Sequence, residues 1–195
     1  MEALQAQIEP HFLFNTLGSI DQLIQTDPPR ASKMQQSLIR YLRSAMPQMR
    51  EGGRPTLDQQ VALCRAFLEI MAVRMEGRLQ PVVRVPEGLK SAVFPSMMLQ
   101  TLVENAIKHG LEPRTGGGTV WIRARRDDNT VAVTVADNGE GFNTKTSGTG
   151  IGLKNVRERL RLRYAGAANL SVVANFPAGV AATLTVPANG HNAHV

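Results

Sequence analysis

Apolar and polar positions in the first 50 residues alternate with the period of an α-helix. One apolar stripe lies opposite a polar or small face that includes His11 and Asn15. Asp27-Pro28-Pro29 then interrupts the chain and starts a second stripe, because proline is tolerated in a first helical turn. The first stripe consists of Leu13, Leu17, Ile20 and Ile24, and the second of Ala31, Met34, Leu38, Tyr41, Leu42 and Ala45. Two such helices predict a helical hairpin whose apolar faces need a partner, and dimerisation into a four-helix bundle is the simplest solution.

After residues 51–55, which are expected to form a hinge, the pattern changes. Thr56 and Gln59 form a capping-box pattern, and an apolar stripe continues to Met75 as a third helix. Beyond it, strands mixed with helices predict an α+β fold whose second part is an α/β sandwich, a mainly antiparallel sheet with helices on one face. The expected strands are residues 81–85, 120–126, 130–136, 170–174 and 180–186, and the expected helices are residues 95–109, closed by Gly110, and 151–164.

These elements divide the chain into four predicted parts. The parts are a dimerising hairpin at residues 1–50, a hinge and bracing helix at 51–76, an α/β-sandwich domain at 77–187 and a flexible tail at 188–195. Helical periodicity begins at once, at Leu4 and Ile8, which suggests a fragment cut from a longer protein within a helix. Pro10 is expected to kink this helix just before His11, because proline cannot donate the usual backbone hydrogen bond.

Composition narrows the class of protein only a little. With 195 residues, 43% hydrophobic and 19% charged, the sequence has the composition of a globular chain and not of a disordered one. The net charge of +6 suits anionic partners such as a nucleotide, an acidic protein or nucleic acid. The single cysteine, Cys64, excludes a disulfide framework within the chain and is expected to be buried. No apolar run approaches membrane-spanning length, and no signal peptide is recognisable.

The helix that contains residues 102–110 carries the first of three short motifs that suit a nucleotide and its magnesium ion. Asn105 and Lys108 are expected to share a polar face with Thr101, while apolar residues pack on the sheet. An amide oxygen from Asn105 and phosphate oxygens make a suitable Mg²⁺ shell, and Lys108 can reach phosphate oxygens as a point charge. His109 fits phosphate contact and simple placement of a cation at a helix C-terminus about equally well.

The other two motifs bring glycines to the predicted site. Asp137 ends a strand and is followed by two glycines, Gly139 and Gly141, which let the chain approach a flat base while the carboxylate accepts a hydrogen bond from an exocyclic amino group such as that of adenine. Glycines at 148, 150 and 152 precede and begin a helix, where backbone N–H groups and the helix dipole can hold phosphates. Either motif alone would also fit an ordinary turn or loop.

Together the three motifs resemble the N, G1 and G2 boxes of the Bergerat ATP-binding fold, which histidine kinases, gyrase, mismatch-repair ATPases and a heat-shock chaperone share. Residues 7–17 are similar to the phosphoacceptor motif of LytS/YehU-type sensor histidine kinases, and residues 95–100 and 155–160 also look like that family. The resemblance extends from Leu4 to Pro187. It implies an ATP- and Mg²⁺-dependent protein-histidine kinase that forms a homodimer and passes its phosphoryl group to an aspartate of a response regulator. It also implies the cytoplasmic portion of an inner-membrane sensor, attached to the membrane only through a segment upstream of this chain.

The resemblance assigns roles to particular residues. His11 is the implied phosphoacceptor, with Asn15 either placing water for regulator dephosphorylation or serving as a polar-face residue. Glu9 is the nearest acid, but residues two positions apart do not normally face each other on a helix, so it is a poor candidate for a base. Asn105 is the implied metal ligand. The implied nucleotide contacts are Asn105, Lys108, His109, Asp137, Gly139, Gly141, Thr149, Gly150, Ile151, Gly152 and Leu153.

Two other functions are compatible with the same pocket: a hydrolytic ATPase or conformational clamp, and a non-catalytic ATP-sensing dimer module. Thr101 stands where the related ATPases carry the glutamate that activates water, four positions before the metal-binding asparagine, so hydrolysis is disfavoured. Glu104 is expected to shape the site or the magnesium shell. The arginines at 157, 159, 161 and 163 are spread around their helix without an aromatic platform, so no nucleic-acid partner is expected.

Overall fold

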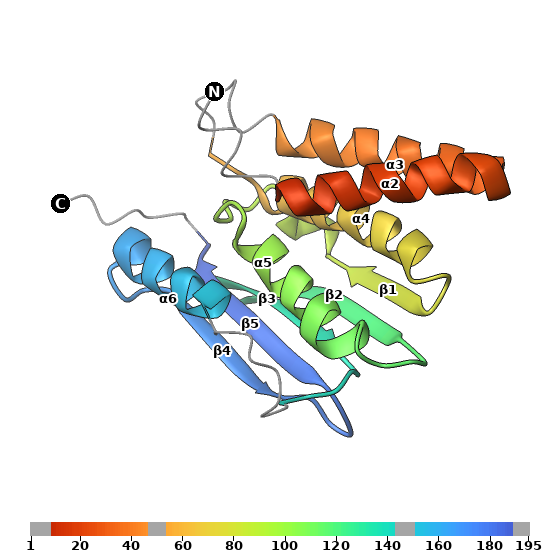
Figure 1. The fold of residues 1–195 in the computed structure, drawn as a ribbon. Helices are drawn as coiled ribbons and strands as arrows, with labels where there is room; N and C mark the ends of the chain where they lie inside the picture. Colours follow the sequence, from red (N-terminus) through yellow and green to blue (C-terminus); the bar gives the residue numbers. More distant parts are fainter. Residues whose placement is uncertain (1–8, 47–53, 143–150, 189–195) are drawn as a thin grey trace.

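The computed structural model describes residues 9–46, 54–142 and 151–188 and shows a group of helices followed by a helix-covered sheet (Figure 1). The helices are α2 (Pro10–Thr26), α3 (Pro28–Ala45), α4 (Leu57–Arg74), the short 3₁₀ helix η2 (Glu87–Leu89), α5 (Met98–Asn105), the π-helical η3 (Ala106–Leu111) and α6 (Ile151–Tyr164). The strands are β1 (Leu79–Arg84), β2 (Gly118–Asp127), β3 (Thr130–Asp137), β4 (Asn169–Ala174) and β5 (Val180–Pro187).

The strands form one mixed sheet in the order β1-β2-β3-β5-β4. β1 pairs with β2 in parallel, and the remaining neighbours are antiparallel, including the predicted hairpin of β2 and β3. α4, α5 and α6 contact β1, β3 and β4 respectively and cover the same side of the sheet (Figure 1). The predicted fold class, an α+β chain with a helical hairpin followed by an α/β sandwich, is therefore confirmed.

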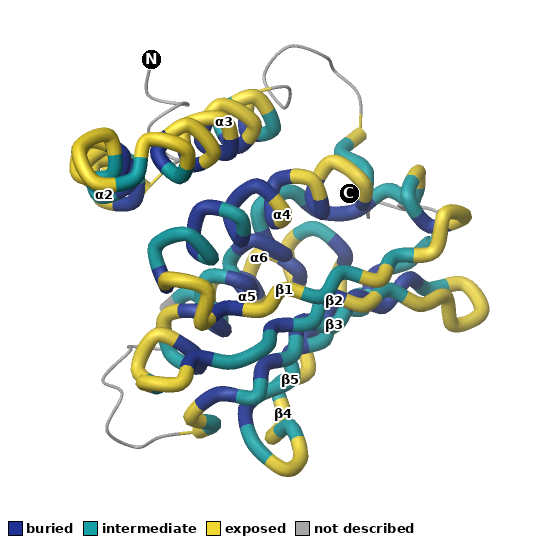
Figure 2. Tube along the Cα trace, turned by 90° about the vertical axis from the view of Figure 1, so that its right-hand side faces the viewer, coloured by how far each residue is buried: buried dark blue, intermediate teal, exposed yellow. Residues whose placement is uncertain are grey.

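α4 packs between the hairpin and the sheet domain, and it is buried over most of its surface (Figure 2). Its predicted capping box is present, since Thr56 N–H donates to Gln59 Oε1 at 3.0 Å and Gln59 N–H donates to Thr56 Oγ1 at 3.4 Å. Cys64 is buried as expected, with 1% of its surface exposed, and burial raises the pKa of its thiol. This helix thus contributes apolar surface both to the hairpin and to the domain.

The predicted apolar stripe of α3 is buried as expected apart from the half-buried Leu42, whereas that of α2 is only partly buried within one chain. The buried face of α2 consists of Phe12, Thr16 and Ile20, while Leu17 and Ile24 are 47% and 53% exposed. The Phe12 ring packs on Tyr41 and Phe67, with ring centroids 5.3 and 5.1 Å apart. Apolar residues cover more than one face of α2, so periodicity alone could not identify the face that α3 and α4 cover.

Two further expectations about helix ends need correction. Pro10 occupies the first turn of α2 after an extended Glu9, so the described helix begins at Pro10 and is not kinked there. The helix predicted from Pro95 begins at Met98, after Met97 in a left-handed conformation with φ of 64°, and continues as η3 past Gly110. Leu4 and Ile8 and most of the predicted hinge lie outside the described residues.

Candidate nucleotide and phosphotransfer site

Asp137 lies at the end of β3 with 2% of its surface exposed. Its Oδ1 accepts a hydrogen bond from Gly139 N–H at 2.8 Å, and its carbonyl oxygen accepts one from Asn175 Nδ2 at 2.8 Å. Burial raises the pKa of the Asp137 carboxyl, while the backbone N–H groups of Gly139 and Val180 lower it. The result is a buried, oriented carboxylate with acceptor capacity left for a ligand.

Glycines allow the first two motifs to touch. A Cβ atom on Gly110 would lie 2.7 Å from Asp137 Oδ1, and one on Gly139 would collide with the carbonyl oxygen of Gly110. Gly110 therefore makes room for Asp137 from within η3, whereas it was expected to close a helix. Gly141 has a φ of 77°, a conformation that L side chains rarely adopt, as its proposed place beside a base requires.

The third motif meets the first at Asn105. A Cβ atom on Gly152 would lie 3.4 Å from Thr101 Cγ2 and 3.7 to 3.9 Å from the side-chain amide of Asn105. The first turn of α6, which begins at Ile151, therefore lies against the proposed metal ligand, and Leu153 follows as a half-buried residue. Gly148, Thr149 and Gly150 lie outside the described residues.

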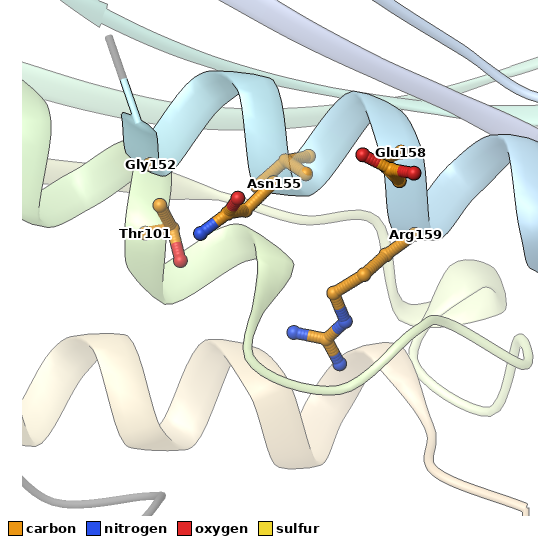
Figure 3. Close-up of a pocket in the computed structure, with 6 residues that line it drawn as sticks. Thr101, Gly152, Asn155, Glu158 and Arg159 are labelled. Carbon is orange, nitrogen blue, oxygen red and sulfur yellow. The ribbon is translucent and has the colours of Figure 1, made fainter. Parts of the chain in front are cut away.

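A cavity of about 400 Å³ lies between α5 and α6 beside this contact (Figure 3). Asn155 points toward Thr101, and Arg159 extends to the loop before α5, where its Nη2 donates to the carbonyl oxygen of Ser96 at 3.4 Å. The cavity is lined by Thr101, Gly152, Asn155, Val156, Glu158 and Arg159. Sequence analysis did not place Asn155 in the site, although its helical spacing from Gly152 was a usable signal.

The polar residues around Asn105 differ in their surroundings. Lys108 is exposed and His109 is half-buried, both on η3. Glu104 is turned toward the hairpin, where its Oε1 accepts a hydrogen bond from Gln100 Nε2 at 2.8 Å. Burial raises the pKa of Glu104, the bond from Gln100 lowers it, and the charges of Glu9 and Lys108 raise and lower it respectively. This orientation favours the site-shaping role expected for Glu104 over the magnesium-shell role.

The described residues include no group of three or more acidic, histidine or cysteine side chains that could hold a metal ion alone. The predicted Mg²⁺ donor set, the amide oxygen of Asn105 completed by phosphate oxygens and water, needs no such group and stays a prediction. That composition suits an ion that keeps several waters and binds through few protein ligands.

His11 is exposed near the start of α2. Asn15, one turn later, places its Nδ2 atom 3.2 Å from His11 Nε2 and 3.3 Å from His11 Nδ1. Glu9 is exposed at the N-cap of the same helix. The structure thus brings Asn15, and not Glu9, into contact with the predicted phosphoacceptor.

Comparison with known protein families accounts for both halves of the chain. Residues 91–190 match the family described as histidine kinase-, DNA gyrase B-, and HSP90-like ATPase. Residues 1–79 match the family described as histidine kinase. The chain belongs to the histidine kinases. The predicted family resemblance is therefore confirmed.

Individual relatives of this histidine kinase are similar over most of its length. It is 35% identical over 192 residues to the sensor histidine kinase YesM of Bacillus subtilis, covering 96% of this chain and 33% of YesM. It is 34% identical over 174 residues to the sensor protein LytS of Oceanobacillus iheyensis, covering 82% of this chain and 30% of LytS. The chain therefore spans about a third of the length of these curated relatives.

Solved structures support the fold. The histidine kinase ThkA, in complex with the response regulator protein TrrA, matches with a TM-score of 0.51 and 14% identity over 92% of this chain and 60% of ThkA. Within the described residues, no helix has the length and apolar character needed to span a membrane.

Proposed function

We propose that this histidine kinase binds Mg²⁺-ATP between α5 and α6, transfers the γ-phosphoryl group to His11, and then passes it to an aspartate of a response regulator. The observation that carries the proposal is the closeness of Gly152 to Asn105 beside the cavity, where a Cβ atom on the glycine would lie 3.7 to 3.9 Å from the amide; this brings together two nucleotide motifs that lie far apart in the sequence. The buried Asp137 supports adenine as the base, because a fixed carboxylate favours an exocyclic amino group. Lys108 would act as an exposed cation for the phosphates.

His11 has the exposure that a nucleophile needs when its phosphate donor and its acceptor partner both come from other domains. A neutral ring nitrogen would attack the γ-phosphorus, the bond to the β-phosphate oxygen would break, and ADP would leave as the ring proton passes to solvent. A bound Mg²⁺ ion would offset charge on the phosphates. If the Asn15 amide turns so that its oxygen accepts the ring N–H, the other ring nitrogen keeps its lone pair for attack. We therefore assign Asn15 an orienting role, and Glu9 remains a poor candidate for a base.

The homodimer is part of the same proposal. Phe14, Leu17 and Ile24 on α2 are 71%, 47% and 53% exposed, and Ile39 and Met46 at α3 are 43% and 53% exposed. A second hairpin would cover these residues in a four-helix bundle, and this would explain why the predicted apolar stripe of α2 is only partly buried within one chain. We further propose an upstream membrane sensor segment and a cytoplasmic location for this chain, since its relatives are named as sensors and are about three times as long.

One observation disfavours the hydrolytic alternative. Thr101 stands where the related ATPases carry the base that activates water, and its Oγ1 donates to the carbonyl oxygen of Met97 at 2.9 Å. A hydroxyl held in this way does not supply a base for water.

Incubation with γ-labelled ATP tests the proposed function. The chain should acquire an acid-labile, alkali-stable label, and His11→Gln should bind ATP normally without becoming labelled. Normal labelling of His11→Gln would refute the acceptor assignment. Rapid ADP formation without label would favour the ATPase, and binding with neither product nor label would favour the ATP-sensing module.

A further inference from the structure

A buried hydrogen-bonded chain crosses the junction between the hairpin and the nucleotide-binding domain. Gln100 Nε2 on α5 donates to the hydroxyl oxygen of Tyr41 on α3 at 2.8 Å and to Glu104 Oε1 at 2.8 Å. Tyr41 and Gln100 are 1% and 2% exposed. We call these three residues, Tyr41, Gln100 and Glu104, the polar bridge.

One end of the polar bridge lies next to the helix of the proposed phosphoacceptor, and the other end lies next to the proposed nucleotide site. The Tyr41 ring packs edge-on against Phe12, with centroids 5.3 Å apart, and Phe12 directly follows His11 in α2. Glu104 directly precedes Asn105, the proposed metal ligand. A continuous set of contacts therefore links the helix of the phosphoacceptor to the helix that would hold the nucleotide.

Hydrogen bonds in a buried junction restrict movement more than apolar contacts do. Apolar side chains can slide past each other with little loss, whereas a buried amide loses its partners after a displacement of about 1 Å. Gln100 uses both of its amide protons in the bridge, while its Oε1 has no hydrogen-bond partner among the described residues. Burial raises the pKa of Tyr41 to about 12, so the hydroxyl stays neutral and available. The bridge therefore favours one position of α5 against α3 without satisfying every group in it.

We propose that Tyr41, Gln100 and Glu104 are positioning residues that couple nucleotide binding at Asn105 to the placement of His11. The inference rests on the proposed function, because it takes His11 as acceptor and Asn105 as part of the ATP site. Coupling of this kind is reciprocal: displacement of α2 and α3 would alter α5, and ATP held at α5 would restrain the hairpin. The hairpin could thus regulate phosphoryl transfer without contacting the nucleotide.

Tyr41→Phe is the central test, because it removes one hydroxyl and keeps the ring against Phe12. At saturating ATP, the rate of His11 phosphorylation should fall about tenfold, while the dissociation constant for ATP stays within about twofold of that of the unsubstituted chain. Tyr164→Phe is the matched control, since Tyr164 is the second tyrosine, is 3% exposed and lies on α6 outside the bridge. It should change neither quantity.

Variants of Glu104 separate the bridge from simple loss of packing. Glu104→Gln keeps an oxygen that can accept from Gln100 and should retain most of the rate, whereas Glu104→Ala should lose about as much as Tyr41→Phe. The double variant Tyr41→Phe/Glu104→Ala should be no slower than either single variant, because both break the same chain. Fully additive losses would contradict a shared bridge.

Hydrogen exchange supplies a readout that does not depend on phosphoryl transfer. ATP should slow amide exchange in α2 of the unsubstituted chain, and this effect should be absent from Tyr41→Phe. The inference would be overturned if Tyr41→Phe were phosphorylated at the normal rate and kept its ATP-dependent protection. It would also be overturned if the loss of phosphorylation rate were explained by weaker ATP binding, or if Tyr164→Phe lost as much. If the unsubstituted chain bound ATP without becoming labelled, the proposed function would fail, and the exchange measurement alone would decide the coupling.

Discussion

The hairpin and the sheet domain bury their apolar residues to different extents. In the sheet, Val133 and Leu184 have no exposed surface. The exposed apolar residues of the domain are scattered over α6, β4 and bends, and include Leu162, Val173 and Phe176. On α2, exposed apolar residues recur along the helix, including Phe14 and Ile24. The domain therefore buries its core within one chain, whereas the hairpin leaves apolar surface exposed, which the proposed homodimer would cover. Substitutions in the domain should consequently affect folding and ATP binding, whereas substitutions on the exposed face of the hairpin should affect dimerisation.

The largest effect is expected where two motifs touch in the domain. Gly139→Ala would drive a methyl group into the carbonyl oxygen of Gly110, and the backbone of a packed core cannot easily move aside. We expect a loss of about 3 kcal/mol in the free energy of unfolding and loss of ATP binding. Chemical denaturation and calorimetry with ATP measure the two quantities.

Gly18→Ala in α2 is the matched control for this substitution. A methyl group on Gly18 would meet nothing within 4 Å, and alanine favours a helix over glycine by about 0.5–1 kcal/mol. The hairpin variant should therefore be slightly more stable. Equal destabilisation by both alanines would contradict the close contact between Gly139 and Gly110.

The next effect concerns the base-binding carboxylate. Asp137→Asn should weaken adenine nucleotide binding at least about tenfold, because the amide that replaces the buried carboxylate turns a donor toward the ligand or toward Gly139 N–H. Asp137 must be ionised to accept two donors, so affinity should be high above its raised pKa and fall as pH decreases through it. Titration with ADP measures the affinity of Asp137→Asn and, when repeated over a range of acidic pH with the unsubstituted chain, the pH dependence of binding. An unchanged affinity in Asp137→Asn would contradict adenine recognition by this residue.

Some parts of the fold could be predicted from sequence and others could not. Helix α6 and the β2–β3 hairpin lie within a residue or two of the predicted positions because turn residues and periodicity are local signals. The continuation of the helix through Gly110 was missed because a glycine is usually read as a helix end, whereas here it makes room for Asp137 from a strand distant in sequence. The same limit explains α2, whose buried face depends on which side α3 and α4 cover.

The candidate site was likewise predicted only where local motifs indicated it. The motif resemblance placed Asn105 and Gly152 in one site, and the structure brings them close together. Asn155 could have been found from its helical spacing from Gly152, whereas the hydrogen bond from Arg159 to Ser96 depends on how α6 packs along α5, which local sequence patterns do not indicate. The polar bridge likewise joins residues from two helices that are separated by α4 and β1 in sequence.

A third prediction addresses the exposed face of α2. Leu17→Glu should weaken the proposed homodimer at least about tenfold, because a charge would have to be buried in the four-helix interface. Unfolding of the sheet domain should be unaffected, since Leu17 is not part of its core. Analytical ultracentrifugation over a range of concentrations measures the first effect. Gln22→Glu, an exposed polar position on the same helix, should leave the assembly unchanged, and a Leu17→Glu protein that dimerised normally would exclude this face.

The smallest effect is expected at an exposed ion pair between the hairpin and α4. Glu69 pairs with Arg40 and accepts a hydrogen bond from Ser37 Oγ at 3.0 Å, but the Arg40 and Glu69 side chains remain 51% and 44% exposed. Solvent screens such a pair, so Glu69→Gln should reduce the free energy of unfolding by less than about 1 kcal/mol, and less again at high salt. Glu158→Gln, which affects only a 3.9 Å pair with Arg161 within α6, is the control and should cause no measurable change. A loss of several kcal/mol from Glu69→Gln would mean that the surface pair, and not the buried contacts of Phe12 and Tyr41, holds the hairpin to α4.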